Sequence, residues 1–155
     1  MKSTRKPKVV GISSGGGHWV QLLRLRPAFA ECNLTLVTVK PGYRSDIGDT
    51  GIKFRVVPDA NRTDKLGLIR TALSVLWMLL QERPDVLIST GAAPGYFAIR
   101  FGKFLRVKTI WLDSVANVEE LSLSGQQAGK HADLWLTQWE HLASPSGPHF
   151  RGSIL

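Results

Sequence analysis

The sequence predicts an α/β domain with a parallel, Rossmann-like sheet, and three observations support this prediction. Short apolar runs alternate along the 155 residues with longer segments of helical pattern, as in strand–helix–strand units. The first run, over residues 8–14, leads through three consecutive glycines into a helical segment. The second run, over residues 34–39, consists of Leu, Thr and Val throughout, which is typical of a strand buried on both faces.

The remaining elements follow in chain order within one domain over residues 1–155, in which residues 1–7 form a flexible basic tail. Residues 18–30 have the apolar spacing of a helix, which Pro27 ends or kinks because it lacks an N–H donor. The other expected elements are a polar loop over 40–51, a strand over 53–57, a helix over 66–82, a strand over 86–90, a loop over 91–95, a helix to about residue 105, a strand over 109–112, a partly helical segment over 121–131 and a strand over 134–137. Residues 144–148 have the composition of a linker, and residues 152–155 resemble the start of a continuation.

Composition indicates a folded chain with an anionic partner. Twenty Lys and Arg residues against twelve Asp and Glu give a net charge of +8, which suits nucleic acid, an anionic membrane surface or a phosphorylated substrate. We expect no nucleic acid partner, because neither an RNA-binding aromatic motif nor a helix-turn-helix pattern is present. The lone Cys32 excludes a disulfide framework and a multi-cysteine metal site, and we expect it to pack as a small buried hydrophobe.

Apolar runs in this sequence are too short to span a bilayer. The longest, over residues 72–80, is interrupted only by Ser74 and falls well short of the roughly 20 residues that a spanning helix needs. The basic N-terminus is not followed by the apolar core and cleavage site of a signal peptide. We therefore expect a cytosolic chain, or one bound peripherally at the cytoplasmic face of a membrane.

Three segments that could carry chemistry each follow a predicted strand: residues 13–18, residues 90–95, and Asp113 with Ser114. Parallel sheets bind ligands beyond the carboxyl ends of their strands, so we expect these segments to share one cleft. The four histidines lack the spacing of a metal site, and we expect neither a metal nor a cofactor.

The first of these segments places Ser14, Gly15, Gly16 and Gly17 before a helix whose first turn carries His18. Glycines allow an anion to approach the backbone N–H groups at a helix N-terminus, where His18 would stand beside it. The alternative is a tight strand–helix turn with a surface histidine. The GxxxxGKS/T phosphate loop and the GxGxxG dinucleotide pattern are both absent, which argues against an NTPase and an NAD enzyme.

The other two segments each allow two interpretations. Gly91 and Gly95 belong to a small-residue loop that is either a second cradle for an anion or sugar, or an ordinary strand–helix connection. Asp113 ends an apolar strand, where its carboxylate could act as a base or bind a hydroxyl. It could equally cap the next turn through Ser114 or Asn117.

A basic stripe and an apolar helix define a candidate docking surface. Arg100 and Lys103 are three residues apart on one predicted helix, and Leu76, Trp77 and Leu80 lie in the apolar run of another. An apolar helix near basic residues can dock on anionic lipid. Packing of that helix onto the sheet or onto a partner protein is the alternative.

Taken together, these motifs resemble the Alg-fourteen-like family, which includes bacterial exopolysaccharide-synthesis subunits. The N-terminal match is Ser-Ser-Gly-Gly-Gly-His over residues 13–18. The more specific matches lie further along the chain, in residues 89–95, 108–114, 121–125, 132–139 and 152–155. Their order and spacing run essentially from end to end.

The resemblance implies the N-terminal half of a GT-B glycosyltransferase, which binds a polyprenyl-diphosphate-linked acceptor. By motif position, Gly16, Gly17 and His18 would face the acceptor diphosphate or the reaction centre, and His18 or Asp113 would take the proton of the acceptor hydroxyl. Asp113 stands where the family usually carries Glu, which is one methylene longer, and this departure favours a hydroxyl-binding role over a direct catalytic role.

The same resemblance implies a second subunit that binds the UDP-sugar and is catalytic, so that this chain alone would be inactive. The chain would then belong to a hexosyl- or N-acetylhexosaminyltransferase in oligosaccharide or exopolysaccharide biosynthesis and would recruit its partner to the membrane. The alternative is a non-catalytic scaffold that only recruits the partner, for which His18 and Asp113 would be dispensable.

Overall fold

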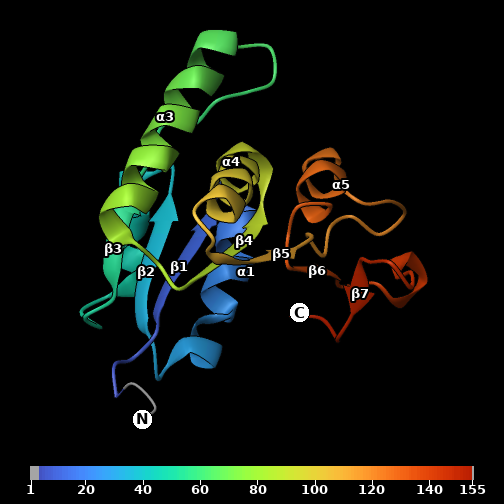
Figure 1. Ribbon diagram of the computed structural model, residues 1–155, viewed down its shortest axis with the longest axis horizontal. Coiled ribbons are helices and arrows are strands. Elements are labelled where there is room, and N and C mark those ends of the chain that lie inside the picture. The colour runs from blue at the N-terminus through green and yellow to red at the C-terminus, as the bar shows by residue number, and fades with distance from the viewer. Residues whose placement is uncertain (1–3, 155) are drawn as a thin grey trace.

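A computed structural model describes residues 4–154 and contains a seven-stranded sheet in the order β3-β2-β1-β4-β5-β6-β7 (Figure 1). Each pair of neighbouring strands is parallel. The strands are β1 (Lys8–Ser13), β2 (Asn33–Thr38), β3 (Lys53–Val56), β4 (Val86–Gly91), β5 (Lys108–Leu112), β6 (Leu134–Thr137) and β7 (His149–Phe150). The predicted Rossmann-like α/β class is therefore confirmed.

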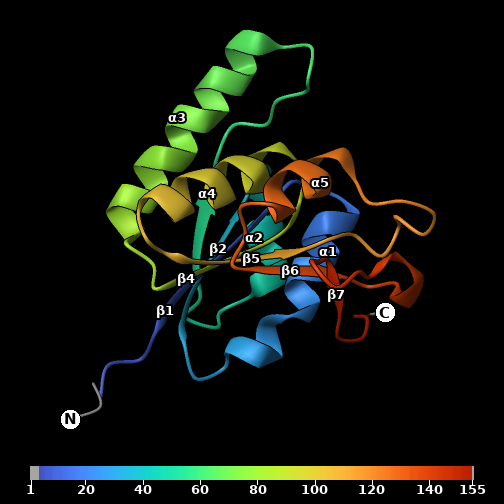
Figure 2. The same ribbon diagram turned by 45° about the vertical axis from the view of Figure 1, so that its right-hand side comes forward.

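Helices cover both faces of this sheet. They are α1 (Gly17–Arg24), α2 (Arg44–Ile47), α3 (Lys65–Glu82), α4 (Ala92–Phe104) and α5 (Leu123–Gly129), with 3-10 turns η1 (Arg26–Phe29), η2 (Pro41–Tyr43) and η3 (Glu140–Leu142). Figure 2 shows α3, α4 and α5 along one face and α1 on the other. The first turns of α3 project beyond the carboxyl ends of the strands (Figures 1 and 2).

Alternating side chains of the central strands build a core on each face. On β1, Val10 and Ile12 join the cluster formed with α3 and α4, whereas Val9 joins the cluster of Trp19 and Leu22 on α1. All five side chains are at most 2% exposed. Burial on both faces explains why these strands are apolar without the alternation of a half-exposed strand.

The strand order reverses direction between β1 and β4, which creates the crevice where such sheets bind ligands. From β1 the sheet extends through β2 to β3 on one side and through β4 to β7 on the other. Ser13 pairs with Gly91 at the carboxyl end of this central pair. Because α1 follows β1 on one face and α4 follows β4 on the other, the crevice lies between the starts of these two helices.

Several predicted boundaries are wrong for identifiable reasons. The first helix ends at Arg24, and the next residues form η1, because Pro27 cannot continue an α-helix. Residues 91–95 are not a loop: Gly91 alone makes the turn, and α4 begins at Ala92. Pro94 is tolerated in the first turn of α4, where backbone N–H groups have no partner within the helix.

Other differences concern segments without regular sequence pattern. The polar loop over residues 40–51 contains η2 and α2. The expected linker over residues 144–148 is a turn into β7, in which His149 pairs with Leu136 of β6. Of the expected basic tail, residues 1–3 lie outside the described residues, and Arg5 forms an ion pair with Asp85 at 2.9 Å. Residue 155 of the expected continuation also lies outside them.

One ion-pair cluster joins the edge of the sheet to α3. Lys53 and Arg55 of β3 each contact the carboxylate of Glu82, the last residue of α3, at 2.8 Å. Burial raises the pKa of the Glu82 carboxyl, but the hydrogen bonds and charges of the two cations outweigh it, so that the pKa lies below its usual range.

Candidate functional site

His18 lies in the first turn of α1 and is fixed against the end of β4. Its Nδ1 lies 2.9 Å from the carbonyl oxygen of Thr90, and the Thr90 hydroxyl donates a 2.7 Å hydrogen bond to the carbonyl of His18. A carbonyl oxygen only accepts, so Nδ1 carries a proton. In the neutral ring the free lone pair is then on Nε2.

Gly91 makes room for this imidazole. A Cβ at this position would collide with the ring of His18, and the backbone adopts a φ of 142°, which side chains rarely tolerate. Glycine at this point of the chain is thus required by the close approach of α1 to β4. Residues from the first and second of the three segments meet here, through the contact of His18 with Thr90 and Gly91.

Gly16 and Gly17 form the open rim of the site. Gly16 has a φ of 67°, both residues are exposed, and a Cβ at either position would meet no atom within 4 Å. The N-cap is Gly16, which has no side chain to accept hydrogen bonds from the first-turn N–H groups of α1. Ser14 and Gly15 are half-buried behind this rim, where the Ser14 carbonyl accepts a 3.3 Å hydrogen bond from Thr38.

An aromatic pair that the sequence did not identify supports the glycine segment. Tyr43 of η2 stacks on Trp19 of α1, with ring centroids 5.5 Å apart, and its hydroxyl accepts a 3.0 Å hydrogen bond from the Gly16 N–H. The Trp19 indole N–H donates to Asp46 at 2.8 Å. The Nζ of Lys40 lies 5.7 Å from the Tyr43 ring centroid, which places a cation beside the glycines. The length of the 40–51 loop was the only sequence signal for this contact.

Asp113 is buried and holds the loop that follows β5. Its carboxylate is 1% exposed and accepts hydrogen bonds from the Ser122 hydroxyl at 2.6 Å and the Ser122 N–H at 3.0 Å. The Trp111 indole and the Asn117 amide each donate to it at 3.2 Å. Asn117, which the capping interpretation named, is one of these four donors, and the two from Ser122 hold the start of α5.

A buried glutamine pair connects α1 to the ends of β5 and β6. The Oε1 of Gln21 accepts hydrogen bonds from the side chain of Gln138 at 2.6 Å and from the Val115 N–H at 3.0 Å. Its Nε2 donates to the Ser114 hydroxyl at 3.0 Å. Neither glutamine was singled out from the sequence, because their contact joins segments far apart in the chain.

Comparison with known proteins assigns a family to this arrangement. Residues 52–153 match the family described as "Oligosaccharide biosynthesis protein Alg14 like". The chain belongs to this Alg14-like family. It is also 26% identical to the UDP-N-acetylglucosamine transferase subunit ALG14 of Yarrowia lipolytica, over 88% of this chain and 76% of that protein.

Solved structures share the fold of the Alg14-like chain. The MurG structure of Acinetobacter baumannii matches 95% of it with a TM-score of 0.75 at 12% identity. The UDP-N-acetylglucosamine 2-epimerase of Rickettsia bellii matches 97% of it with a TM-score of 0.70 at 16% identity. The match covers 46% of each of those two chains, so the Alg14-like chain spans less than half of either. MurG is a GT-B glycosyltransferase, and the predicted fold class is confirmed.

Gly95 has a structural explanation in the Alg14-like fold. It is buried where α4 crosses β4, and a Cβ there would collide with the hydroxyl of Ser89 and approach the ring of Trp111. This glycine permits close packing of helix and sheet, and it does not line the open rim with Gly16 and His18.

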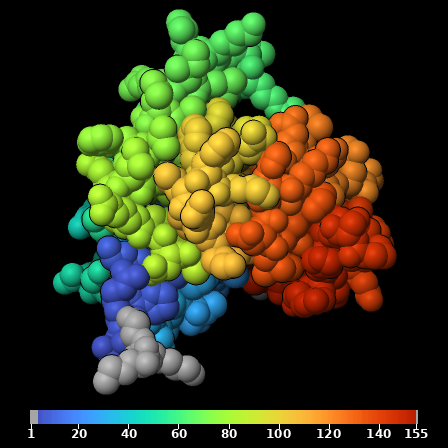
Figure 3. Space-filling model, in the orientation of Figure 1, coloured from blue at the N-terminus to red at the C-terminus, as the bar shows by residue number. Residues whose placement is uncertain are grey.

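Helix α3 presents an apolar stripe to solvent. Trp77 is 62% exposed and Leu80 is 46% exposed, whereas Leu76 is half-buried. The stripe continues further toward the helix N-terminus than predicted, to residues that are spaced on the same face: Leu66, Ile69 and Leu73. In Figure 3 the outer surfaces of α3, α4 and α5 form one continuous face of the molecule. Among the described residues, no helix is both long and apolar enough to cross a membrane.

Arg100 and Lys103 lie on this helical face, on α4. Arg100 is half-buried and its Nη1 lies 2.8 Å from Nε2 of His131, whereas Lys103 is exposed. Within residues 4–154, no group of three or more His, Cys, Asp or Glu side chains is placed to hold a metal ion.

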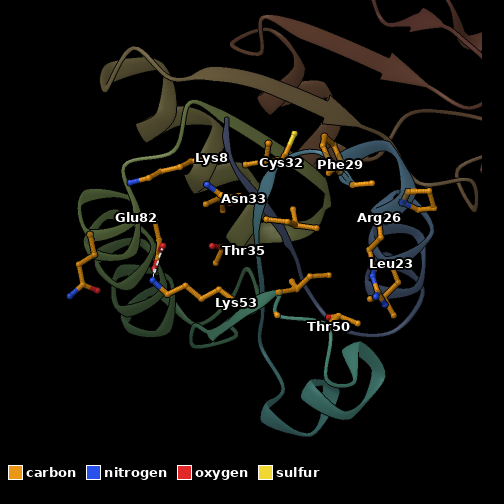
Figure 4. Close-up of a pocket in the computed structure, with 18 residues that line it drawn as sticks. Lys8, Leu23, Arg26, Phe29, Cys32, Asn33, Thr35, Thr50, Lys53 and Glu82 are labelled. Atoms are coloured by element: carbon orange, nitrogen blue, oxygen red, sulfur yellow. Dashed lines mark hydrogen bonds and ion pairs between the residues drawn. The ribbon is translucent and has the colours of Figure 1, made fainter. Parts of the chain in front are cut away.

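A cavity lies away from the site, at the amino-terminal edge of β1, β2 and β3 (Figure 4). It has a volume of about 880 Å³ and is lined by Lys8, Arg26, Lys53 and Glu82 among others. Cys32 also lines it and is half-buried, so the expected full burial of this thiol is not observed. The cavity is separated from His18 by the length of the strands, and the paired charges of Lys53 and Glu82 close one side of it.

Proposed function

We propose that this chain is the acceptor-binding subunit of a two-chain transferase that moves N-acetylglucosamine from its UDP derivative to a polyprenyl-diphosphate-linked acceptor. The family assignment supports this, as does the printed name of the Yarrowia relative, which describes a transferase subunit. Because that name describes one subunit, the proposal includes a second domain that binds the nucleotide sugar. In this proposal that second domain is a separate polypeptide.

The observation that carries the proposal is the fixed tautomer of His18 at the switch point. The Thr90 carbonyl holds the proton on Nδ1, which leaves Nε2 as the base. In the proposed reaction the acceptor hydroxyl oxygen forms a bond to the anomeric carbon of the sugar. The bond from that carbon to the UDP oxygen breaks and its electron pair leaves with UDP, while Nε2 takes the hydroxyl proton.

The acceptor diphosphate would lie on the open rim beside this base. The first-turn N–H groups of α1 and the positive end of its dipole favour an anion next to Gly16 and Gly17. Lys40 adds a positive charge on the neighbouring loop. In this arrangement Asp113 holds the loop after β5 and does not touch the reacting atoms.

The apolar stripe on α3 would keep the subunit at the membrane that carries the acceptor. Its first turns project at the same edge of the sheet as the site (Figure 1), and the exposed cations Arg62, Lys65 and Arg70 lie on or next to this helix. An aromatic side chain carries about 150–250 Å² of surface, so burial of the exposed part of Trp77 would contribute about 2–4 kcal/mol at about 25 cal/mol per Å². Basic residues add attraction to anionic lipid.

The test reconstitutes transfer from the tagged chain and the subunit that co-purifies with it from native membranes. Radiolabelled UDP-N-acetylglucosamine and a polyprenyl-diphosphate-linked acceptor are the substrates. We expect transfer only with both chains, and a loss of about 100-fold or more for His18→Ala. His149→Ala is the matched control, since β7 lies at the far end of the sheet (Figure 1), and it should retain full activity.

Two outcomes would contradict this proposal. Transfer by this chain alone would exclude the separate donor-binding partner. Full activity of the complex with His18→Ala would exclude His18 as the base. It would favour the alternative in which this chain is a scaffold that only recruits the catalytic chain. Circular dichroism of the variant ensures that a loss of activity is not a loss of fold.

A further inference from the structure

Arg100 and His131 form an unusual contact between two positively chargeable side chains. The guanidinium Nη1 on α4 lies 2.8 Å from the imidazole Nε2 in the turn after α5, and both groups are half-buried. A guanidinium is always charged and only donates, so the imidazole must be neutral at Nε2 and accept this hydrogen bond. The pair is therefore compatible with only one protonation state of His131.

Further cations surround this pair. Burial lowers the pKa of His131, and the charges of Arg100, Lys103 and Lys130 lower it further. Asp133, the carboxylate next along the chain, accepts hydrogen bonds from the N–H and hydroxyl of Thr109 instead. The ion pairs formed within residues 4–154 all lie elsewhere, so no carboxylate neutralises the three cations.

Helix dipoles account for only part of this cluster. Lys103 lies in the last turn of α4 and Lys130 is the C-cap of α5, where cations are favourable. This does not explain why the Arg100 side chain is directed at a histidine. A guanidinium, two ammonium groups and an imidazole on one surface form the donor set that binds phosphate in proteins.

We propose that Arg100, Lys103, Lys130 and His131 form a binding site for a phosphate group, distinct from the rim beside His18. Phe104 follows Lys103 and is 82% exposed, which places an apolar side chain next to the cations, as at a lipid interface. The phosphate is that of an anionic lipid headgroup or of a soluble phosphate ester. This phosphate site depends on the proposed function in one respect only: both place the face formed by α3, α4 and α5 toward the membrane.

Phosphate binding changes the protonation of His131. An anion between the cations offsets their repulsion, and it gives the imidazole an acceptor for a second N–H. Over the pH range in which His131 gains its proton, we therefore expect phosphate to bind the protonated form more tightly than the neutral form. The charged groups that face His131 are Arg100 and Lys103 from α4 and Lys130 from α5, all of which stay charged over this range.

The experiment follows the His131 imidazole of the full chain by NMR in pH titrations. The probes are glycerol phosphate, vesicles of phosphatidylcholine and vesicles of phosphatidylcholine with phosphatidylglycerol. We expect the His131 pKa to rise by about one unit with a phosphate probe, which corresponds to about tenfold tighter binding to the protonated form. A rise with glycerol phosphate assigns a soluble ester, and a rise only with phosphatidylglycerol vesicles assigns a lipid headgroup.

The double variant Lys103→Gln/Lys130→Gln should weaken binding about tenfold or more, because each ammonium contributes to phosphate attraction. Arg44→Gln on α2 removes a charge on the opposite face and is the matched control. An unchanged His131 pKa with every probe would overturn the site, as would equal effects of the double variant and the control. A failed transfer assay leaves this result intact, because glycerol phosphate binding needs neither acceptor nor partner.

Discussion

Replacement of Asp113 by Ala separates a structural from a catalytic role of this carboxylate. It is 1% exposed and accepts four hydrogen bonds, two from Ser122 and one each from Trp111 and Asn117. Alanine would leave all four donors without their acceptor in the interior. The segment between β5 and α5 would lose the side chain that fixes its path.

The magnitude follows from these contacts. A hydrogen bond to a charged group contributes about 1.5–3 kcal/mol, but the four are not additive because a freed loop can expose its donors to water. We therefore expect Asp113→Ala to lower the free energy of unfolding by about 3–5 kcal/mol. That is a large part of the roughly 5–15 kcal/mol by which a typical domain is stable.

Urea unfolding followed by tryptophan fluorescence measures this loss. The matched control is Asp64→Ala, which removes an exposed carboxylate with one 2.9 Å hydrogen bond to the N–H of Gly67 at the start of α3. Loss of such an N-cap costs about 1 kcal/mol. If Asp113→Ala is no more destabilising than this control, the structural role is refuted. Lost transfer activity with unchanged stability would instead place Asp113 at the reacting groups.

Three further predictions concern backbone strain and charge. Gly91→Ala should lower the free energy of unfolding by at least about 2 kcal/mol, because alanine is strained at this positive φ and its Cβ collides with His18. The control Gly42→Ala places its Cβ in open space and should leave the free energy of unfolding in urea unchanged. Glu82→Gln should lower the free energy of unfolding by about 1–2 kcal/mol at neutral pH, because the side chain loses its ion pairs with Lys53 and Arg55. In urea unfolding this difference from the unmodified chain should vanish as the pH falls through the lowered pKa of the carboxyl. A pH-independent difference would contradict the ion-pair explanation. The pKa of His131 is lowered by burial and neighbouring cations, so the folded chain binds a proton less readily than the unfolded chain. The stability of the folded chain should therefore fall as the pH drops below about 6.5. In thermal unfolding, the melting temperature of His131→Gln should decrease less over the same pH range.

The fold was predictable because its signals are local. The apolar runs at β1 and β2 predict strands from their own residues alone. The proline at residue 84 likewise predicts the end of α3, which lies two residues before it. The turn into α4 and the strand β7 were missed for the opposite reason. The turn at Gly91 depends on a positive φ and on space for the His18 ring, and the two residues of β7 are strand only through pairing with β6.

The same distinction divides the candidate site. His18, Gly16 and Gly17 were found because consecutive glycines before a helix form a recognisable pattern. Gln21 and Gln138 could not be found this way, since they are 117 positions apart and have no motif around them. For Asp113 the sequence indicates only a position at a strand end, because its burial and its four donors depend on the folded loop.

These long-range contacts explain how a short helix can hold the His18 ring in one orientation. His18 and Gln21 are one turn apart on α1, so the helix is fixed to β4 through Thr90 and to the loops after β5 and β6 through the glutamine pair. A helix held at two points cannot rotate about its axis without breaking buried hydrogen bonds. The direction of Nε2 is therefore set by three strand ends together, and the exposed glycine rim can remain open without loss of orientation at the histidine.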